Sequence, residues 1–463
     1  MERRIAKGRP KAHDPEDCRV PGCERCKLDV PFELPSQIVE AYKNADLVVF
    51  AGAGVSTESE GVFPPTFYER IRRELKIPKE RKISFPDLMS RYCGPPMSRK
   101  DLLLAIKNRI DEVKAFPGSY TFATEFHREL ATIPHLNEIF TTNWDDFFEG
   151  VCNATPVVTG QDFAVFQDIP GRKVFKLHGS IYNYGSIVAT KSDYETCYRK
   201  LSTSIIGAKL KMLLMSKTLV FFGFSFDDQD FLRLYRLLKN EVGGMLPQCY
   251  VVTLDTNAKR KLNELGIQAT PILTGATYFV QKLKKELVEQ GLMLPDSQYL
   301  GIPEMLKVLV SEDRKIQKLG LAEHPDLVYS VAYQNGFMHA LQRLATGRNS
   351  GVCSCGPHMI DTIKLYDPAI KTASRKKHYE QIAYLTGYQT GLVFYLSTPE
   401  ERKKVPLYFM YGCNEDIMNL EQCANLEKEA AASNRSAHEQ AEKAVKGMRK
   451  DIFILYPPFF CAL

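Results

Sequence analysis

Two glycines and a serine that follow a short apolar run are well suited to bind a phosphate group. Residues 47–50 are all apolar and lead into Gly52, Ala53, Gly54 and Ser56. After a buried strand, glycines in such a turn leave backbone N–H groups open to a diphosphate, and the next segment can point its N-terminus at the same anion. A tight strand-to-helix turn without a ligand has the same pattern, so this motif alone leaves both interpretations open.

Polar or glycine residues also follow three later segments that are built around apolar residues. They are Asn143 and Asp145 after 138–142, His178 after 173–177, and Gly223 and Ser225 after 218–222. Because the carboxyl ends of parallel strands meet at one edge of a sheet, we expect these residues at one rim. The plainer alternative is that Asn143 and Asp145 cap the next helix and that His178 is a core residue.

The elements that must position these residues alternate between strand and helix. Five segments built around apolar residues predict strands, at 47–50, 138–142, 173–177, 218–222 and 249–254. Helices are predicted between them, including one over 121–133, where Phe122, Phe126 and Leu130 recur every four residues. The alternation predicts an α/β fold, a doubly wound, Rossmann-like parallel sheet that the strand at 249–254 closes.

The chain divides into three parts by this pattern. Residues 1–34 are a polar extension, and residues 35–290 are the α/β domain, with a helical insertion near 66–114 that we expect to cover the site. Residues 295–463 show helices without buried strands, and we expect a mainly helical C-terminal domain for oligomerisation or partner binding. The strongly apolar segment 451–460 is expected to be buried, in this domain or in a neighbour.

Two segments of the C-terminal region have similar sequences. Residues 331–337 and 382–388 share Ala, Tyr and Gly in register, which is meaningful only if a helical pair is duplicated and is otherwise chance. Glycine in a helix costs roughly 1 kcal/mol unless close packing compensates for it. Gly336 and Gly387 therefore predict helices in close contact.

Two groups of cysteine and histidine residues have metal-binding chemistry. Cys23 and Cys26 form a Cys-x-x-Cys pair that suits tetrahedral zinc, and His13 or Cys18 can complete the site. The alternative is a tail with incidental thiols. We expect any metal here to be structural, and we assign no metal ligand to the reaction site. A second group, at 353–358, has the Cys-x-Cys spacing that is uncommon for zinc.

Composition excludes several other classes of protein. With 61 basic and 55 acidic residues, the net charge of +6 is too small to indicate nucleic-acid binding. The sequence has no apolar run near the ~18 residues of a membrane span and no signal peptide, so we expect a cytoplasmic protein. The twelve cysteines are scattered, which favours reduced thiols over a disulfide framework.

Taken together, the motifs resemble those of the sirtuin superfamily over about 35–290. They are Gly52-Ala-Gly-Val-Ser56, Thr142-Asn-Trp-Asp145, Leu177-His-Gly179 and Gly223-Phe-Ser225. The chain is more similar to the bacterial sirtuin-like, NAD-hydrolysing branch than to the protein deacylases. That branch has a doubled Thr before the Asn, acidic residues after it, and a Thr-x-x-x-Tyr segment, here Thr190 to Tyr194.

Two features of the deacylases are missing. Between His178 and Gly223 the chain has only Cys197, where deacylases have the two cysteine pairs of a zinc ribbon. The loop Gly61-Val-Phe-Pro-Pro-Thr-Phe67 also lacks the arginine of the deacylase loop. The resemblance therefore implies an intact NAD site without an acyl-lysine channel.

The resemblance implies roles for all the site residues. By analogy, Gly52, Ala53, Gly54 and Ser56 hold the diphosphate, Asn143 and Asp145 face the nicotinamide ribose, His178 is the base, and Gly223 and Ser225 meet the adenosine side. The implied activity is NAD glycohydrolysis, which releases nicotinamide and ADP-ribose. The alternatives are an NAD-dependent protein deacylase and a non-catalytic sensor of NAD or ADP-ribose.

The resemblance also implies a biological setting. Members of this branch deplete NAD in anti-phage defence once a partner detects infection. They include Thoeris effectors, defence-associated sirtuins and sirtuin-like subunits that pair with a HerA-type ATPase. We therefore expect a homo-oligomer with a possible regulatory partner.

Overall fold

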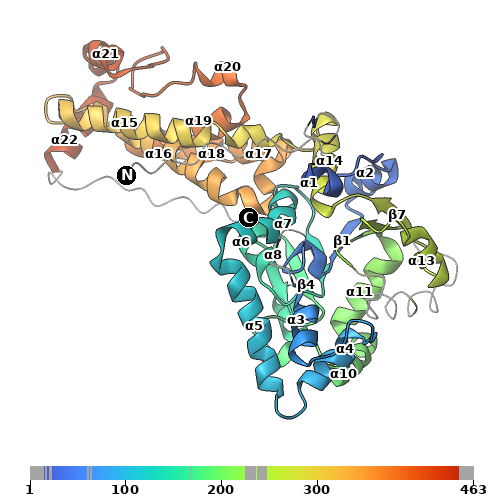
Figure 1. Ribbon diagram of the computed structural model, residues 1–463. Coiled ribbons are helices and arrows are strands. Elements are labelled where there is room, and N and C mark those ends of the chain that lie inside the picture. Colours follow the sequence, from blue (N-terminus) through green and yellow to red (C-terminus); the bar gives the residue numbers. More distant parts are fainter. Residues whose placement is uncertain are drawn as a thin grey trace. The chain divides into compact units, whose positions relative to one another are not determined.

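The computed structural model describes residues 15, 18–19, 23–59, 62, 65–166, 168–224, 236 and 248–447 (Figure 1). His13, Ser225 and the apolar tail at 451–460 lie outside this part of the chain. The protein divides into two compact units, Met1–Gln290 and Gly291–Leu463.

The first unit is built on a parallel sheet of seven strands in the order β3-β4-β2-β1-β5-β6-β7. The strands are β1 (Leu47–Ala51), β2 (Glu138–Thr141), β3 (Thr155–Val157), β4 (Lys173–Lys176), β5 (Thr218–Phe222), β6 (Cys249–Thr253) and β7 (Thr270–Leu273). Helices flank the sheet (Figure 1), which is why the buried central strands read as continuous apolar runs. The predicted α/β fold with a doubly wound parallel sheet is confirmed, and so are all five predicted strands.

The prediction that the strand at 249–254 closes the sheet is wrong. β7 lies beyond β6, and β3 forms the opposite edge. Both edge strands are short and contain a proline, Pro156 or Pro271, which lacks the N–H group that a central strand needs. Strands of this kind have no apolar run to mark them.

Thirteen helices of the first unit fall within its described residues. They are α1 (Glu24–Leu28), α2 (Ser36–Lys43), α3 (Phe67–Glu74), α4 (Phe85–Tyr92), α5 (Arg99–Ala115), α6 (Pro117–Ala123), α7 (Glu125–Ala131), α8 (Phe147–Cys152), α9 (Gly160–Phe166), α10 (Lys191–Thr203), α11 (Ile205–Ser216), α13 (Ala258–Glu264) and α14 (Ala276–Glu289).

The prediction of one helix over 121–133 is also wrong. α6 ends at Ala123 and α7 begins at Glu125, because the Thr124 hydroxyl donates to the Tyr120 carbonyl (2.5 Å) and competes with the helical bonds. Phe126 is consequently buried, whereas Phe122 is 46% exposed.

The second unit is mainly helical. Its helices are α15 (Ile302–Leu319), α16 (Leu327–Gly347), α17 (Gly356–Lys364), α18 (Tyr366–Arg375), α19 (Tyr379–Leu396), α20 (Pro399–Arg402), α21 (Leu420–Ser433) and α22 (Arg435–Gly447). A core rich in tyrosine lies between α15, α16 and α19. Among the described helices, none is both long and apolar enough to cross a membrane.

The predicted close contact between glycine-bearing helices is confirmed. A Cβ at Gly336 in α16 would lie 2.0 Å from the Tyr384 carbonyl oxygen of α19. A Cβ at Gly387 in α19 would lie 1.9 Å from the Tyr333 carbonyl oxygen of α16. The two similar segments of the sequence are therefore the two sides of one helix crossing.

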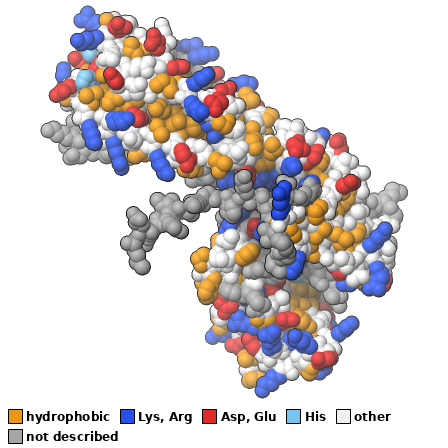
Figure 2. All heavy atoms as spheres, turned by 45° about the horizontal axis from the view of Figure 1, so that its top comes forward, with side chains coloured by type: hydrophobic (Ala, Val, Ile, Leu, Met, Phe, Trp, Pro, Cys, Tyr) orange, Lys and Arg blue, Asp and Glu red, His pale blue; other side chains and the backbone are white. Residues whose placement is uncertain are grey.

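Acidic and basic side chains are interspersed on the molecular face shown in Figure 2, with apolar side chains between them. Such mixing fits the small net charge and presents no extended basic surface on this face.

Candidate functional site

Four strands end at the same level of the sheet. Ala51 of β1 pairs with Thr141 of β2 and with Phe222 of β5, and Thr141 pairs with Lys176 of β4. The residues that come next in each strand therefore emerge along one edge. Because β2 and β5 flank β1 on opposite sides, this edge includes the topological switch point where doubly wound sheets bind ligands.

The turn after β1 lies directly against the end of β5. The N–H groups of Gly52 and Gly54 donate to the carbonyls of Phe222 (2.8 Å) and Gly223 (3.1 Å). A Cβ at Gly52 would lie 2.6 Å from the Gly223 oxygen, and Gly223 itself has a φ of +65°. These glycines thus allow two backbone segments to touch, with Ala53 and Gly54 left exposed on the turn.

Asn143 is held at this edge by its backbone and by its amide. Its backbone N–H donates to Thr141 Oγ1 (3.0 Å), and its side-chain Nδ2 donates to the Gly52 carbonyl (3.1 Å). The second bond fixes the amide orientation and joins the ends of β1 and β2. Asn143 is 5% exposed, and its Oδ1 is buried without a hydrogen-bond partner. A buried acceptor in this state is unfavourable unless a ligand or water supplies a donor.

Ser56 and Asp145 form a buried pair under the same edge. The Ser56 hydroxyl donates to Asp145 Oδ2, and Asp145 Oδ1 accepts from the Phe147 N–H (3.1 Å) at the start of α8. Burial raises the pKa of Asp145, against the opposing effects of Lys176 and the Ser56 hydrogen bond. The two carboxylate oxygens of Asp145 therefore link the turn after β1 to the start of α8.

His178 follows β4 in a well-supported turn. Leu177 N–H donates to the Thr141 carbonyl (2.9 Å), and the His178 carbonyl accepts from Val188 N–H (3.0 Å). The His178 ring is 5.1 Å from the Tyr194 ring, and the side chain is 5% exposed. Tyr194 lies in the first turn of α10, where Thr190 forms the N-terminal capping box. The Thr-x-x-x-Tyr segment thus positions a ring against His178.

Comparison with known proteins finds a similar domain over most of the sheet. A protein-family model described as a SIR2-like domain matches residues 137–270. Residues 137–270 are thus similar to a SIR2-like domain. That domain spans the strands that carry Asn143, Asp145, His178 and Gly223, while the glycine turn after β1 precedes the matched residues.

Individual relatives are similar to about two fifths of the chain. The chain is 28% identical over 202 residues to "NAD(+) hydrolase ThsA" of Cytobacillus dafuensis, which is 42% of this chain and 39% of the relative. It is 27% identical over 208 residues to the protein of that name in Enterococcus faecium, 43% of this chain and 41% of the relative. For Acinetobacter baumannii (strain 532279) the identity is 28% over 202 residues, 42% and 39% of the two chains. The similarity thus spans about two fifths of these relatives' length.

Lys176 and Glu149, which both lie within the matched residues, support the site from inside. Lys176, the last residue of β4, is 2% exposed; its ammonium group donates to the Asp145 carbonyl and to Glu149 Oε1 (2.8 Å). Burial raises the pKa of Glu149, with Lys176 opposing the shift. Glu149 belongs to the acidic residues that follow Asn143 in the sequence, whereas Lys176 has no motif of its own.

The helical insertion contacts the turns of the site. Helices α3, α4 and α5 share an apolar cluster with Ile181 and Ile187, which follow His178, and with Trp144, which separates Asn143 from Asp145. Arg109 of α5 donates to the Thr57 carbonyl (2.8 Å) and to Glu58 Oε1 (3.3 Å), just beyond Ser56. The insertion therefore packs on the polar edge of the SIR2-like domain.

The cysteine groups differ in geometry. Among the residues that the structure describes, only Cys18, Cys23 and Cys26 bring three metal-ligand atoms together. Cys353, Cys355 and His358 are all described but do not form such a group.

Proposed function

We propose that this protein hydrolyses NAD to nicotinamide and ADP-ribose, with NAD as substrate and no other cofactor. The observation that carries the proposal is Asn143 Oδ1, a buried acceptor without a partner at the switch point of the sheet. Its amide nitrogen is anchored to Gly52, so the oxygen has a fixed direction. A ribose hydroxyl or a water molecule supplies the donor that this oxygen lacks.

The proposed reaction needs few protein groups. The bond between the ribose C1′ and the nicotinamide nitrogen breaks, its electron pair leaves with nicotinamide, and a water oxygen adds to C1′. Asn143 binds a ribose hydroxyl or that water, and His178 accepts the proton that is released. Asp145 offsets the positive charge that develops on the ribose and positions Ser56. In this proposal the turn that carries Gly52, Ala53 and Gly54 lies along the diphosphate, with Ser56 buried beneath it, and Gly223 lies along the adenosine.

The names of the relatives support hydrolysis, since each is called an NAD(+) hydrolase. An NAD-dependent protein deacylase and a non-catalytic sensor are the alternatives. A deacylase needs an acyl-peptide groove, for which we find no sequence feature. A sensor would tolerate loss of the proton acceptor, whereas this chain keeps His178 on a supported turn.

We also propose the biological setting that the sirtuin-like resemblance implies. The enzyme acts in the cytoplasm as an anti-phage effector that depletes NAD, assembles as a homo-oligomer through its second unit, and takes a regulatory partner such as a HerA-type ATPase. Exposed apolar side chains on that unit support assembly, including Leu300 (67%) and Leu365 (66%).

The test is product analysis with the full-length protein, alone and with candidate partners. Incubation with NAD in ¹⁸O-labelled water should give nicotinamide and ADP-ribose with the label on C1′. An acetylated peptide in a parallel reaction should stay acetylated. Faster turnover of the peptide than of NAD alone would favour the deacylase, and tight binding of NAD without products under all conditions would favour the sensor.

A further inference from the structure

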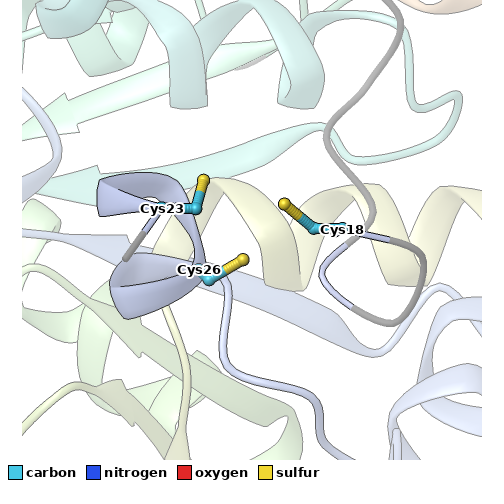
Figure 3. Close-up of side chains that lie close together, drawn as sticks. All are labelled: Cys18, Cys23 and Cys26. Atoms are coloured by element: carbon cyan, nitrogen blue, oxygen red, sulfur yellow. The ribbon is translucent and has the colours of Figure 1, made fainter. Parts of the chain in front are cut away.

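Three cysteines near the start of the described chain point toward one another. Cys23 and Cys26 lie at the start of α1, and Cys18 lies on a separate segment that faces them (Figure 3). Their sulfur atoms all lie within 4.8 Å of one another, and none of the three is in a disulfide. In a tetrahedral zinc–thiolate site the sulfurs are about 3.8 Å apart, for Zn–S bonds of about 2.3 Å. Small side-chain rotations would therefore bring all three into one coordination sphere.

The backbone between the cysteines suits this role. Cys26 N–H donates to the Cys23 carbonyl (3.1 Å), which forms a tight turn that holds both side chains on one side. Two close cysteines on such a turn and a third ligand from elsewhere are the common arrangement of a structural zinc site. The cluster belongs to none of the strands or turns that carry Asn143 and His178.

The segment that contains and follows Cys23 and Cys26 is held against the rest of the first unit. Arg25 donates two hydrogen bonds to Glu125 of α7 (2.9 and 2.5 Å), and the Leu28 carbonyl accepts from Gly275 N–H (2.7 Å). Phe32 stacks on Phe279 of α14, with ring centroids 5.4 Å apart. The cysteines therefore lie where a cross-link would join Cys18 to a segment that is already anchored.

We propose that Cys18, Cys23 and Cys26 bind one zinc ion as thiolates. Each thiol loses its proton to solvent on binding, and the metal needs no oxidant or reductant. A water molecule completes the coordination as the fourth ligand. The ion is structural: it fixes Cys18 to α1, which is held against α7 and the strand–helix turn before α14, and it takes no part in NAD cleavage.

Metal content of the full-length protein tests the proposal directly. After passage over a chelating resin, the wild type should retain about one zinc per chain. Cys18→Ser, Cys23→Ser and Cys26→Ser should each lower that content at least tenfold. Cys93→Ser is the matched control, because Cys93 has a similar partial exposure and lies outside the cluster. Equal zinc in the cluster variants and the control would overturn the proposal.

X-ray absorption of the wild type keeps the proposal testable if the variants fail to fold. The zinc edge should show three sulfur neighbours at about 2.3 Å. A shell of oxygen and nitrogen only, or a protein that takes up no zinc when refolded with it, would overturn the assignment. Neither result depends on NAD hydrolysis, so a failure here is distinct from a failure of the proposed function.

The structural role has its own test. Removing zinc with a chelator should speed tryptic cleavage at Arg25 and Lys27 at least about tenfold, which corresponds to about 1.4 kcal/mol of local stability. An unchanged cleavage rate after zinc has left would contradict the role of the ion in holding α1.

Discussion

The Ser56 hydroxyl donates a hydrogen bond to the Asp145 carboxylate and so joins the turn after β1 to the turn after β2. Both side chains are buried, with Ser56 fully inaccessible. Asp145 also accepts from the Phe147 N–H (3.1 Å), which ties the pair to α8. The geometry of the polar edge thus depends on one hydroxyl–carboxylate contact, and we expect its loss to affect both folding and turnover.

Replacing Ser56 with alanine tests this contact. Ser56→Ala leaves a buried carboxylate without one of its donors, which should lower the free energy of unfolding by about 1–3 kcal/mol. Ser59→Ala is the matched control, because the buried Ser59 hydroxyl has no hydrogen-bond partner and its loss should be neutral. Urea denaturation of the two variants gives the comparison. Equal midpoints for both would show that the Ser56 contact contributes little.

Asn143 and His178 should matter more for turnover than for folding. Truncating a positioned polar group at the reacting centre costs about 2.7–4 kcal/mol of barrier, so Asn143→Ala and His178→Ala should slow NAD cleavage about a hundredfold to a thousandfold. Asn257→Ala, at the start of α13 without a side-chain cap, should keep the wild-type rate. Rates and melting temperatures are measured for each variant with and without the activating partner. A folded His178→Ala protein with full activity would remove His178 from the mechanism.

The buried His127 should make the protein sensitive to acid. Its side chain lies among Phe126, Phe147 and Phe148, neither ring nitrogen has a hydrogen-bond partner, and burial lowers its pKa to about 3. The unfolded chain binds this proton below about pH 6.5. The contribution of neutral His127 to the free energy of unfolding is therefore complete above pH 6.5. It falls by up to about 1.4 kcal/mol per pH unit as the pH is lowered toward 3.

His127→Phe should flatten that pH dependence, while His358→Ala, which removes an exposed histidine, should leave it unchanged. Denaturant midpoints between pH 4 and 7 give the slopes. Identical slopes for wild type and His127→Phe would mean that other groups control the acid response.

A single methyl group at the α16–α19 crossing should be damaging. Gly336→Ala and Gly387→Ala each place a Cβ within about 2 Å of a backbone carbonyl, and overpacking of this kind costs about 1–3 kcal/mol or more. Gly447→Ala, where nothing lies within 4 Å of the new Cβ, is the control from the same unit. Thermal unfolding followed by calorimetry should show a lower transition for the first two variants only.

Charges on the exposed apolar side chains of the second unit should prevent self-assembly. Light scattering should find the full-length wild type as an oligomer and the Leu300→Glu, Leu365→Glu double variant as a smaller species. Val165→Glu is the control, because Val165 is 63% exposed but lies in the first unit. A monomeric wild type at micromolar concentration would refute assembly altogether.

The sequence predicted the central strands well because each is buried on both faces. β1 and β5 read as nearly uninterrupted apolar runs, β2 and β4 have apolar central residues, and the residues after these strands fall at one edge by parallel register. The sequence pattern does not indicate the edge strands β3 and β7, because each is short and contains a proline.

The contacts inside the site could not be predicted in the same way. Ser56 and Asp145 are 89 residues apart, and no local pattern indicates that one hydroxyl meets the other residue's carboxylate. The glycines at 52 and 54 were assigned to a diphosphate from their motif, yet their N–H groups donate to the end of β5. That contact requires the tertiary position of β5, which a one-dimensional pattern does not contain.

The reciprocal contacts of α16 and α19 carry a consequence for relatives of the second unit. Tyr333 precedes Gly336 by the same interval as Tyr384 precedes Gly387, and each tyrosine carbonyl faces the opposite glycine. The crossing therefore has a local pseudo-twofold axis. A larger residue at either glycine would force the opposite helix to move. Paired Ala-Tyr-x-x-Gly segments thus form a search signature for other chains that share this helical unit, whatever catalytic domain precedes it.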